Sequence, residues 1–221
     1  MRVPVAIAAG AAAAYGLPLP AAHVPRLAHA LGIATTLVMP GPHLTFDDGP
    51  HAEATPKVLE LLREHDVTAT FFLVGEQVRR TGALRDEIEA AGHAIGLHGD
   101  THRPLWRLTP GALKSDLDRG EETVRPTVDV HRAPYGAYSL PALYEVMGRG
   151  FNPLLWSRWG RDWRAAATPR QIAQEVTRDV GPHDVLLLHD ADQYADPGSW
   201  RATVAALPAV LEAVIAAQPT R

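Results

Sequence analysis

Cysteine is absent from this 221-residue sequence. The absence excludes disulfide bonds, thiolate metal sites and cysteine nucleophiles together. A metal ion bound to this chain would therefore need histidine, aspartate or glutamate ligands. The redox state of the compartment stays open.

An excess of positive charge is also absent, because 21 lysines and arginines face 25 aspartates and glutamates, for a net charge of −4. No basic surface argues for a nucleic-acid partner. The hydrophobic content of 46% and the length suit one sizeable domain with a real core. No repeat and no linker divide the chain. We therefore expect one domain over 41–221, preceded by an extension over 1–40 with a short helix at 25–33.

The stretch 3–22 lacks charged residues, is rich in alanine, and is broken by Pro4, Pro18 and Pro20. Two interpretations stay open for it. A charged start followed by an uncharged run is typical of a secretion signal or anchor, but a clean small-residue cleavage site is missing, which favours a packed or disordered extension. The prolines argue against a membrane-spanning helix.

Apolar runs alternate with helical patterns through the rest of the chain, which predicts an α/β fold with βα units and a mostly parallel sheet. Thr-Pro pairs, which suit an N-cap and first helical turn, open two of the helices. The expected strands are 43–46, 68–74, 93–97, 128–132, 151–157 and 184–188. The expected helices are 55–65, 82–91, 109–124, 139–148, 168–180 and 199–217, the last of them bent at its proline.

Polar side chains stand at the C-terminal ends of four predicted strands: Asp47 and Asp48, His98, Arg132 and His189. In a parallel barrel or sheet, this edge is where active sites form. We therefore expect these five residues to meet on one rim.

The neighbouring acids Asp47 and Asp48 repel each other, and a bound cation is the simplest means of holding them. His98 and His102 form an H-x3-H pair whose rings can face one point. Asp plus two His leaves an open coordination position, as in catalytic metal sites, with Zn²⁺ as the default ion and Co²⁺, Ni²⁺ or Mn²⁺ as alternatives. Since successive strand side chains point oppositely, one aspartate would be a ligand and the other a general base. Solvated loop acids are the alternative interpretation, but they leave the histidine pair unexplained.

Arg132 could clamp a carboxylate and keep it ionised, and the turn at Tyr135 could aim a backbone N–H at a developing oxyanion. A surface arginine before a turn is the alternative. His189 is either a buried structural residue or a general acid whose pKa a neighbour such as Asp162 would raise.

Tryptophans stack on sugars but more often fill cores. We expect Trp156 to pack inward and Trp163 to line a groove, with Trp106 and Trp200 as core or surface residues.

Five motifs in this order resemble the NodB-type polysaccharide deacetylases, carbohydrate esterase family four, over roughly 43–212. They are TFDDGP at 45–50, HGDTH at 98–102, RAPYG at 132–136, RDW at 161–163 and LLLH at 186–189. The resemblance implies a distorted (β/α) barrel of the seven-stranded type and metal-dependent removal of N-acetyl groups from a glycan such as peptidoglycan, chitin or a chito-oligosaccharide.

The resemblance also implies roles by position. They are Asp47 as general base; Asp48, His98 and His102 as metal ligands; Arg132 as the clamp on the base; the Tyr135 N–H as oxyanion donor; and His189 as general acid with Asp162 its partner. Separately from these roles, we expect Tyr135 and Trp163 to bind substrate. The rival functions are a deformylase or amidase of a lipid-linked sugar or small cyclic amide, and an inactive glycan-binding homologue. The substrate class favours the cell envelope or secretion, with no obligate protein partner and membrane contact only through an N-terminal anchor.

Three departures from the family pattern stand out. Gly99 replaces the usual Ser or Thr, and Leu97 stands where Asn is common, so the surroundings of the metal would differ. The apolar strand that often follows the last helix is missing, and the barrel is therefore expected to be open or closed by the extension.

Overall fold

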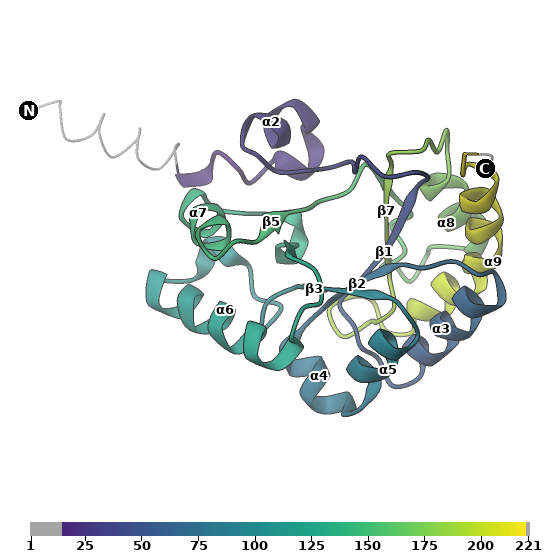
Figure 1. Cartoon of the computed structure of the whole chain (residues 1–221), viewed down its shortest axis with the longest axis horizontal. Helices are drawn as coiled ribbons and strands as arrows, with labels where there is room; N and C mark the ends of the chain where they lie inside the picture. Colours follow the sequence, from purple (N-terminus) through teal and green to yellow (C-terminus); the bar gives the residue numbers. More distant parts are fainter. Residues whose placement is uncertain (1–14, 220–221) are drawn as a thin grey trace, which may run out of the picture.

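A computed structural model describes residues 15–219 of the chain. Its centre is one parallel sheet whose strand order is β5-β4-β3-β2-β1-β7-β6. The strands are β1 (His43–Asp47), β2 (Thr70–Leu73), β3 (Ala94–Leu97), β4 (Val130–His131), β5 (Asn152–Pro153), β6 (Arg158–Trp159) and β7 (Val185–His189). The sheet curls within a ring of helices, and β5 and β6 are its two edges (Figure 1). The predicted fold, a distorted seven-stranded barrel, is confirmed.

The central strands are apolar because both of their faces are buried. Strand β2 reads TFFL and β7 reads VLLLH, and nearly every side chain in them is shielded from solvent. Runs of this kind are typical of parallel strands that are covered on two sides. Strand β1 lies between β2 and β7, and the register sets Asp47 beside His189. Two strand ends that are 142 positions apart in the sequence thus become neighbours.

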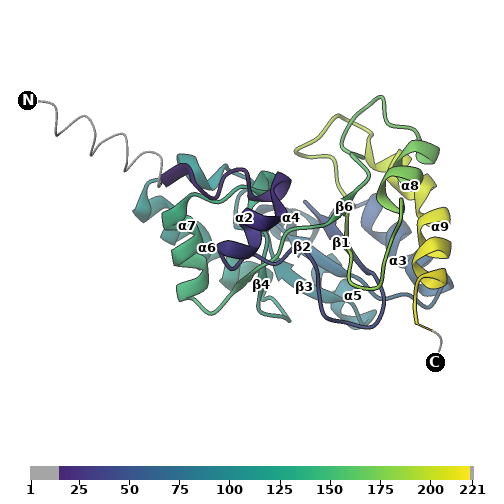
Figure 2. The same ribbon diagram turned by 90° about the horizontal axis from the view of Figure 1, so that it is seen from above.

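Helices cover the outside of the sheet (Figures 1 and 2). Thr109 and Thr168 cap the helices that follow them, as their Thr-Pro pairs predict. The α-helices are α2 (Pro25–Ala30), α3 (Ala54–Glu64), α4 (Gly75–Thr81), α5 (Leu84–Ala90), α6 (Pro110–Val124), α7 (Leu140–Gly148), α8 (Pro169–Val176) and α9 (Trp200–Ala216). Short 3-10 helices are η1 (Ala21–His23), η2 (Leu105–Arg107) and η3 (Pro134–Gly136).

The segment before β1 packs against the barrel and crosses the side between β5 and β7 (Figure 1). Ala34 forms a β-bridge with Leu154, and Thr36 forms one with Asp184. Ala21 has no exposed surface. The part of this segment that the structure describes is therefore bridged to Leu154, just after the edge strand β5, and to Asp184, just before β7. The stretch 1–14, on which the signal and anchor hypotheses depend, lies outside the described residues.

No helix within residues 15–219 has the length and apolar character needed to cross a membrane.

Three elements differ from the sequence-based expectation. Helix α4 was not predicted; it buries only Gly75, Gln77 and Val78, so its apolar periodicity is weak. The strand expected over 128–132 keeps two residues in β4, and the one expected over 151–157 is replaced by β5 and by the following β6. The two-residue strands β4, β5 and β6 lie at or next to an edge of the sheet, where fewer neighbouring strands are available for hydrogen bonding.

Candidate active site

Asp47 ends β1 and Asp48 follows it, and their carboxylates meet different partners. Arg132 Nη1 donates a hydrogen bond to Asp47 Oδ1 over 2.6 Å. Asp48 Oδ1 instead lies 3.3 Å from His98 Nε2 and 3.1 Å from His102 Nε2. The backbone of Asp48 is left-handed, with a φ of 76°, which is rare outside glycine. This turn directs the two neighbouring carboxylates to different partners.

Asp48, His98 and His102 form a buried cluster that could hold a metal ion, since their candidate ligand atoms all lie within 4.8 Å of one another. Asp48 Oδ1 is buried and has no hydrogen-bond partner among the described residues. Burial alone would raise the pKa of Asp48, but His102 and then His98 outweigh it and hold the pKa well below its ordinary value. One anionic oxygen and two imidazole nitrogens fit Zn²⁺ and related divalent ions.

The two histidines of the cluster are held differently. His98 Nδ1 donates a hydrogen bond to the Arg132 carbonyl over 2.7 Å, which leaves Nε2 free to face Asp48. His102 Nδ1 has no partner within the described part of the chain. Its ring instead stacks on Tyr194, with centroids 4.2 Å apart and an interplanar angle of 12°, and meets Tyr135 edge-on at 4.6 Å.

The loop between these histidines depends on a glycine and a buried acid. Gly99 has a φ of +86°, and a Cβ there would lie 3.0 Å from Asp116 Oδ2. Asp116 accepts hydrogen bonds from the backbone N–H groups of Asp100 and Thr101 and from the Thr101 hydroxyl. A serine or threonine at this position of the present chain would be strained and crowded.

Arg132 is fully buried and uses its guanidinium in four directions. It donates to Asp47 and to Thr45 Oγ1, and also to the carbonyl oxygens of Leu154 and Leu155. A buried charge of this kind is tolerated only when it is paired and its hydrogen bonds are satisfied. The surface-arginine interpretation of Arg132 is therefore wrong.

His189 lies beside Asp47 at the end of β7, and Asp162 supports it from behind. His189 Nδ1 donates to Asp162 Oδ1 over 2.8 Å, while Asp162 Oδ2 accepts from the His189 backbone N–H and the Thr203 hydroxyl. Burial would lower the pKa of His189, but the Asp162 carboxylate outweighs it and raises the pKa to about 10. Without a bound metal ion, this raised pKa favours the protonated imidazole at neutral pH.

The paired aspartates, the two histidines of the cluster and His189 line one cavity of about 280 Å³. Its other walls are aromatic or apolar. The lining residues are Asp47, Asp48, His98, His102, Tyr135, Gly136, Trp156, Trp159, Trp163, Leu187, His189 and Tyr194. Tyr135 has a left-handed backbone, with a φ of 60°, and an exposed side chain at the rim. Trp156 is largely buried as expected yet also reaches this cavity.

No role was predicted from the sequence for Trp159 and Tyr194, which line the cavity, or for Asp190, whose carboxylate lies against Gly49. Tyr194 lines the cavity from the segment after β7, and only its closeness to His189 in sequence could have marked it. Asp190 is buried and accepts a hydrogen bond from Thr55 over 2.5 Å, and burial raises its pKa to about 7. Its carboxylate leaves no room for a Cβ at Gly49, which explains the glycine after the paired acids.

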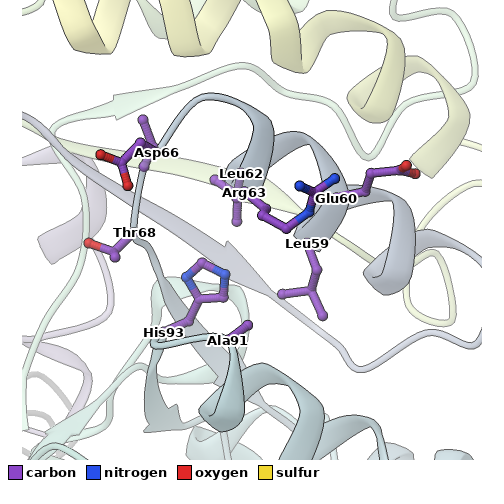
Figure 3. A pocket seen from close by; sticks show the side chains of 9 residues that line it. Leu59, Glu60, Leu62, Arg63, Asp66, Thr68, Ala91 and His93 are labelled. Atoms are coloured by element: carbon purple, nitrogen blue, oxygen red, sulfur yellow. The ribbon is translucent and has the colours of Figure 1, made fainter.

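A larger cavity, of about 450 Å³, opens at the opposite ends of the strands (Figure 3). It is bordered by the end of α3 and by His93, which precedes β3. Arg63, Glu60 and Asp66 surround it, but no group of metal-ligating residues was found there among the described side chains. The smaller cavity is therefore the candidate active site.

Comparison with known proteins agrees with this geometry. A family model described as polysaccharide deacetylase matches residues 41–153, which is more than half of the chain. The chain belongs to the polysaccharide deacetylase family. A chitooligosaccharide deacetylase of Azorhizobium caulinodans is 35% identical over 72% of this chain and 77% of its own length. A peptidoglycan-N-acetylglucosamine deacetylase of Bacillus cereus is 34% identical over 76% and 78%.

A solved structure of a peptidoglycan N-acetylglucosamine deacetylase superimposes with a TM-score of 0.77 at 27% identity, covering 85% of this chain and 88% of its own. The family, the barrel and the hydrolase class predicted from the sequence are confirmed. Polysaccharide deacetylases of carbohydrate esterase family four are metal-dependent, and the Asp-His-His cluster could hold their metal.

Proposed function

We propose that this chain removes N-acetyl groups from an N-acetylated glycan and releases acetate. The observation that carries the proposal is the meeting, in one cavity, of the Asp48-His98-His102 cluster with a clamped carboxylate on Asp47 and a protonated imidazole on His189. An amide hydrolase needs these parts, namely a Lewis acid, a proton acceptor and a proton donor.

The proposed metal ligands are Asp48 Oδ1 and the Nε2 atoms of His98 and His102. Zn²⁺ is our choice of ion, because it accepts mixed nitrogen and oxygen ligands and tolerates an open position. When bound, such an ion polarises an acyl oxygen and makes water easier to deprotonate.

Asp47 is the proposed general base. Its Oδ1 is engaged by Arg132, and its Oδ2 is 3.9 Å from His98 Nε2, so the second oxygen faces the cluster. The Arg132 guanidinium pairs with this carboxylate, whose ionised form is the one that can accept a proton from the attacking water. The attack forms the new C–O bond and leaves negative charge on the acyl oxygen.

The Tyr135 backbone N–H is the proposed donor to that oxygen, on a turn held in a left-handed conformation. His189 is the proposed general acid. Its Nδ1–H is held by Asp162, so Nε2–H is the proton available to the leaving amine nitrogen as the C–N bond breaks. Acetate and a free amino sugar result.

Chitooligosaccharide and peptidoglycan are the substrates named for the relatives. We propose a glycan of this class for the present chain, held by Tyr135 and Trp163, and a site of action in the cell envelope or outside the cell. We also keep the division into an extension over 1–40 and a deacetylase domain over 41–221 as a proposal.

Acetate release from chito-oligomers, peptidoglycan and acetylxylan, measured with and without a chelator, tests the function. We expect release from an N-acetylated glycan that stops on chelation and returns on adding Zn²⁺. Release of formate from a lipid-linked sugar, or opening of a cyclic amide, would favour a rival hydrolase. No product from any glycan, in protein loaded fully with metal, would favour an inactive glycan-binding homologue.

A further inference from the structure

A second cleft, which we call the arginine cleft, borders the candidate active site along β6. It has a volume of about 260 Å³. Its lining residues are Ser157, Arg158, Trp159, Arg161, Glu175 and Arg178. Trp159 also lines the cavity of the candidate active site, so one indole is common to both.

An unbroken aromatic path leads from His189 to this cleft. The His189 and Trp163 rings are 5.6 Å apart, and the Trp163 and Trp159 rings are also 5.6 Å apart. Arg161 Cζ lies 5.4 Å from the Trp159 ring, and Arg164 Cζ lies 5.9 Å from the Trp163 ring. Indole faces suit sugar rings, and each of the two indoles carries a guanidinium beside it.

The arginines of the cleft differ in how many hydrogen bonds and ion pairs their guanidinium groups already form within the protein. Arg158 donates to Asp184 Oδ2 and to the Asp179 carbonyl, so it is largely satisfied. Arg161 meets Glu175 only at 3.7 Å, and both side chains are more than a third exposed, so this pair binds weakly. Arg178 forms no ion pair or side-chain hydrogen bond with the described residues.

Asp184 balances the charge of Arg158, so the positive charge of the cleft rests on Arg161 and Arg178, in a molecule whose net charge is −4. Glu175 is the single acid among the residues that line the cleft, against three arginines. Outside the cleft, Asp196 approaches the same loop but accepts a hydrogen bond from the Ala165 backbone N–H. Guanidinium capacity therefore remains on Arg161 and Arg178.

We propose that the arginine cleft binds a carboxylate carried by a sugar that neighbours the N-acetylated one. The planar guanidinium fork fits a carboxylate with two parallel hydrogen bonds, which a hydroxyl cannot match. The inference rests on the proposed function and narrows it, because the substrate becomes an anionic N-acetylated glycan. A neutral polymer such as chitin offers this cleft no charge.

The test measures binding rather than turnover. Zinc-loaded Asp47→Asn protein, which should not consume its ligand, is titrated by calorimetry. The first ligand is a tetrasaccharide of N-acetylglucosamine and N-acetylmuramic acid with free carboxylates, and the second is the same molecule with those carboxylates amidated. We expect about tenfold tighter binding of the free acid, which is about 1.4 kcal/mol.

Two paired variants place this preference in the cleft. Arg161→Gln with Arg178→Gln should bring the ratio of the two dissociation constants close to one. The matched control, Arg63→Gln with Arg80→Gln, removes the same charge from exposed arginines elsewhere and should keep the ratio. A ratio near one in the parent protein, or an equal ratio in both pairs of variants, overturns the proposal.

A third ligand distinguishes the source of the carboxylate. The same tetrasaccharide with peptides joined to its carboxyl groups carries its charge on the peptide instead of on the sugar. A preference seen with the free tetrasaccharide assigns the cleft to the sugar carboxylate, and one seen only with the peptide-bearing ligand assigns it to the peptide. Failure of the wild-type protein to release acetate, with the preference intact, would count against the proposed hydrolysis and not against the cleft.

Discussion

His98 and His102 present the same imidazole nitrogen to the same oxygen of Asp48, yet different forces orient them. A hydrogen bond from Nδ1 to the Arg132 carbonyl fixes the His98 ring. Two tyrosine rings enclose His102, with Tyr194 stacked on it and Tyr135 against its edge. The first arrangement fixes a tautomer and a direction, whereas the second fixes only the plane of the ring.

The site therefore has two halves, one around His98 and one around His102, which are connected to the rest of the protein through different contacts. Arg132 holds His98 with its carbonyl and Asp47 with its guanidinium, so one residue aligns a proposed ligand with the proposed base. His102 is aligned with the cavity walls instead. Tyr194 is itself tied to α4, since it accepts a hydrogen bond from Gln77 and donates one to Glu76.

The largest effect on acetate release is expected at Asp47, the proposed base, which belongs to the His98 half of the site. Asp47→Asn should lower acetate release by about 10²–10⁴-fold, because an amide cannot accept the proton. Zn²⁺ affinity, measured by calorimetry on the same protein, should be nearly unchanged, since Asp47 is not among the proposed ligands. An active Asp47→Asn protein would sink the proposed role of this carboxylate.

Removing Arg132 should damage both the base and the fold. Arg132→Met leaves the Asp47 carboxylate buried without its partner, which should cost about 3–5 kcal/mol in the free energy of unfolding. Chemical denaturation measures the loss. Adding Asp47→Asn should recover part of it, because no uncompensated charge then remains. Equal stability of the single and double variants would show that this ion pair does not link the His98 half to the core.

The pH profile tests a histidine that belongs to neither half. The pKa of His189 is raised to about 10 without a metal, with attraction from Asp48 and Asp47 adding to that from Asp162. A bound cation would offset part of this attraction, so the alkaline fall in kcat should lie below that value. Asp162→Asn lowers the pKa further and should move the fall to lower pH. An unmoved alkaline limb would exclude His189 as the acid.

The smallest effect is expected at the stacked ring. Tyr194→Leu should weaken Zn²⁺ binding about tenfold, within the range for groups that orient a ligand, because His102 has no hydrogen bond to replace the stack. Tyr194→Phe keeps the ring and should restore most of the affinity. Competition with a zinc-sensitive dye measures both. Equal affinities for the two variants would show that stacking does not orient His102.

Much of this site could be predicted because its parts stand at the ends of short apolar runs. A run such as DVLLLH shows a buried strand with a polar end, and parallel strands bring such ends together. The order of the strands in the sheet could not be predicted from the sequence in the same way. That Asp47 lies beside His189 depends on pairing between strands far apart in sequence, and local pattern says nothing about it.

Other parts were beyond sequence reasoning for definite reasons. Tyr194 lies in an irregular segment rather than at a strand end, and its role depends on which ring it meets. Helix α4 buries few side chains, so its sequence has no clear apolar periodicity from which a helix could be predicted. Trp156 packs inward as predicted, but that its ring also reaches the cavity depends on the tertiary arrangement and not on local pattern.

The position of β1 also bears on how this protein is made. Strand β1 is synthesised early but is completed on one side by β7, which is the last strand in the described part of the chain. During synthesis, one edge of β1 therefore stays unpaired while more than a hundred residues are added. Such long-range pairing slows folding and leaves an apolar edge open to wrong partners. A nascent chain halted before β7 would thus be a natural target for chaperones, although it already carries Asp47, Asp48 and both cluster histidines.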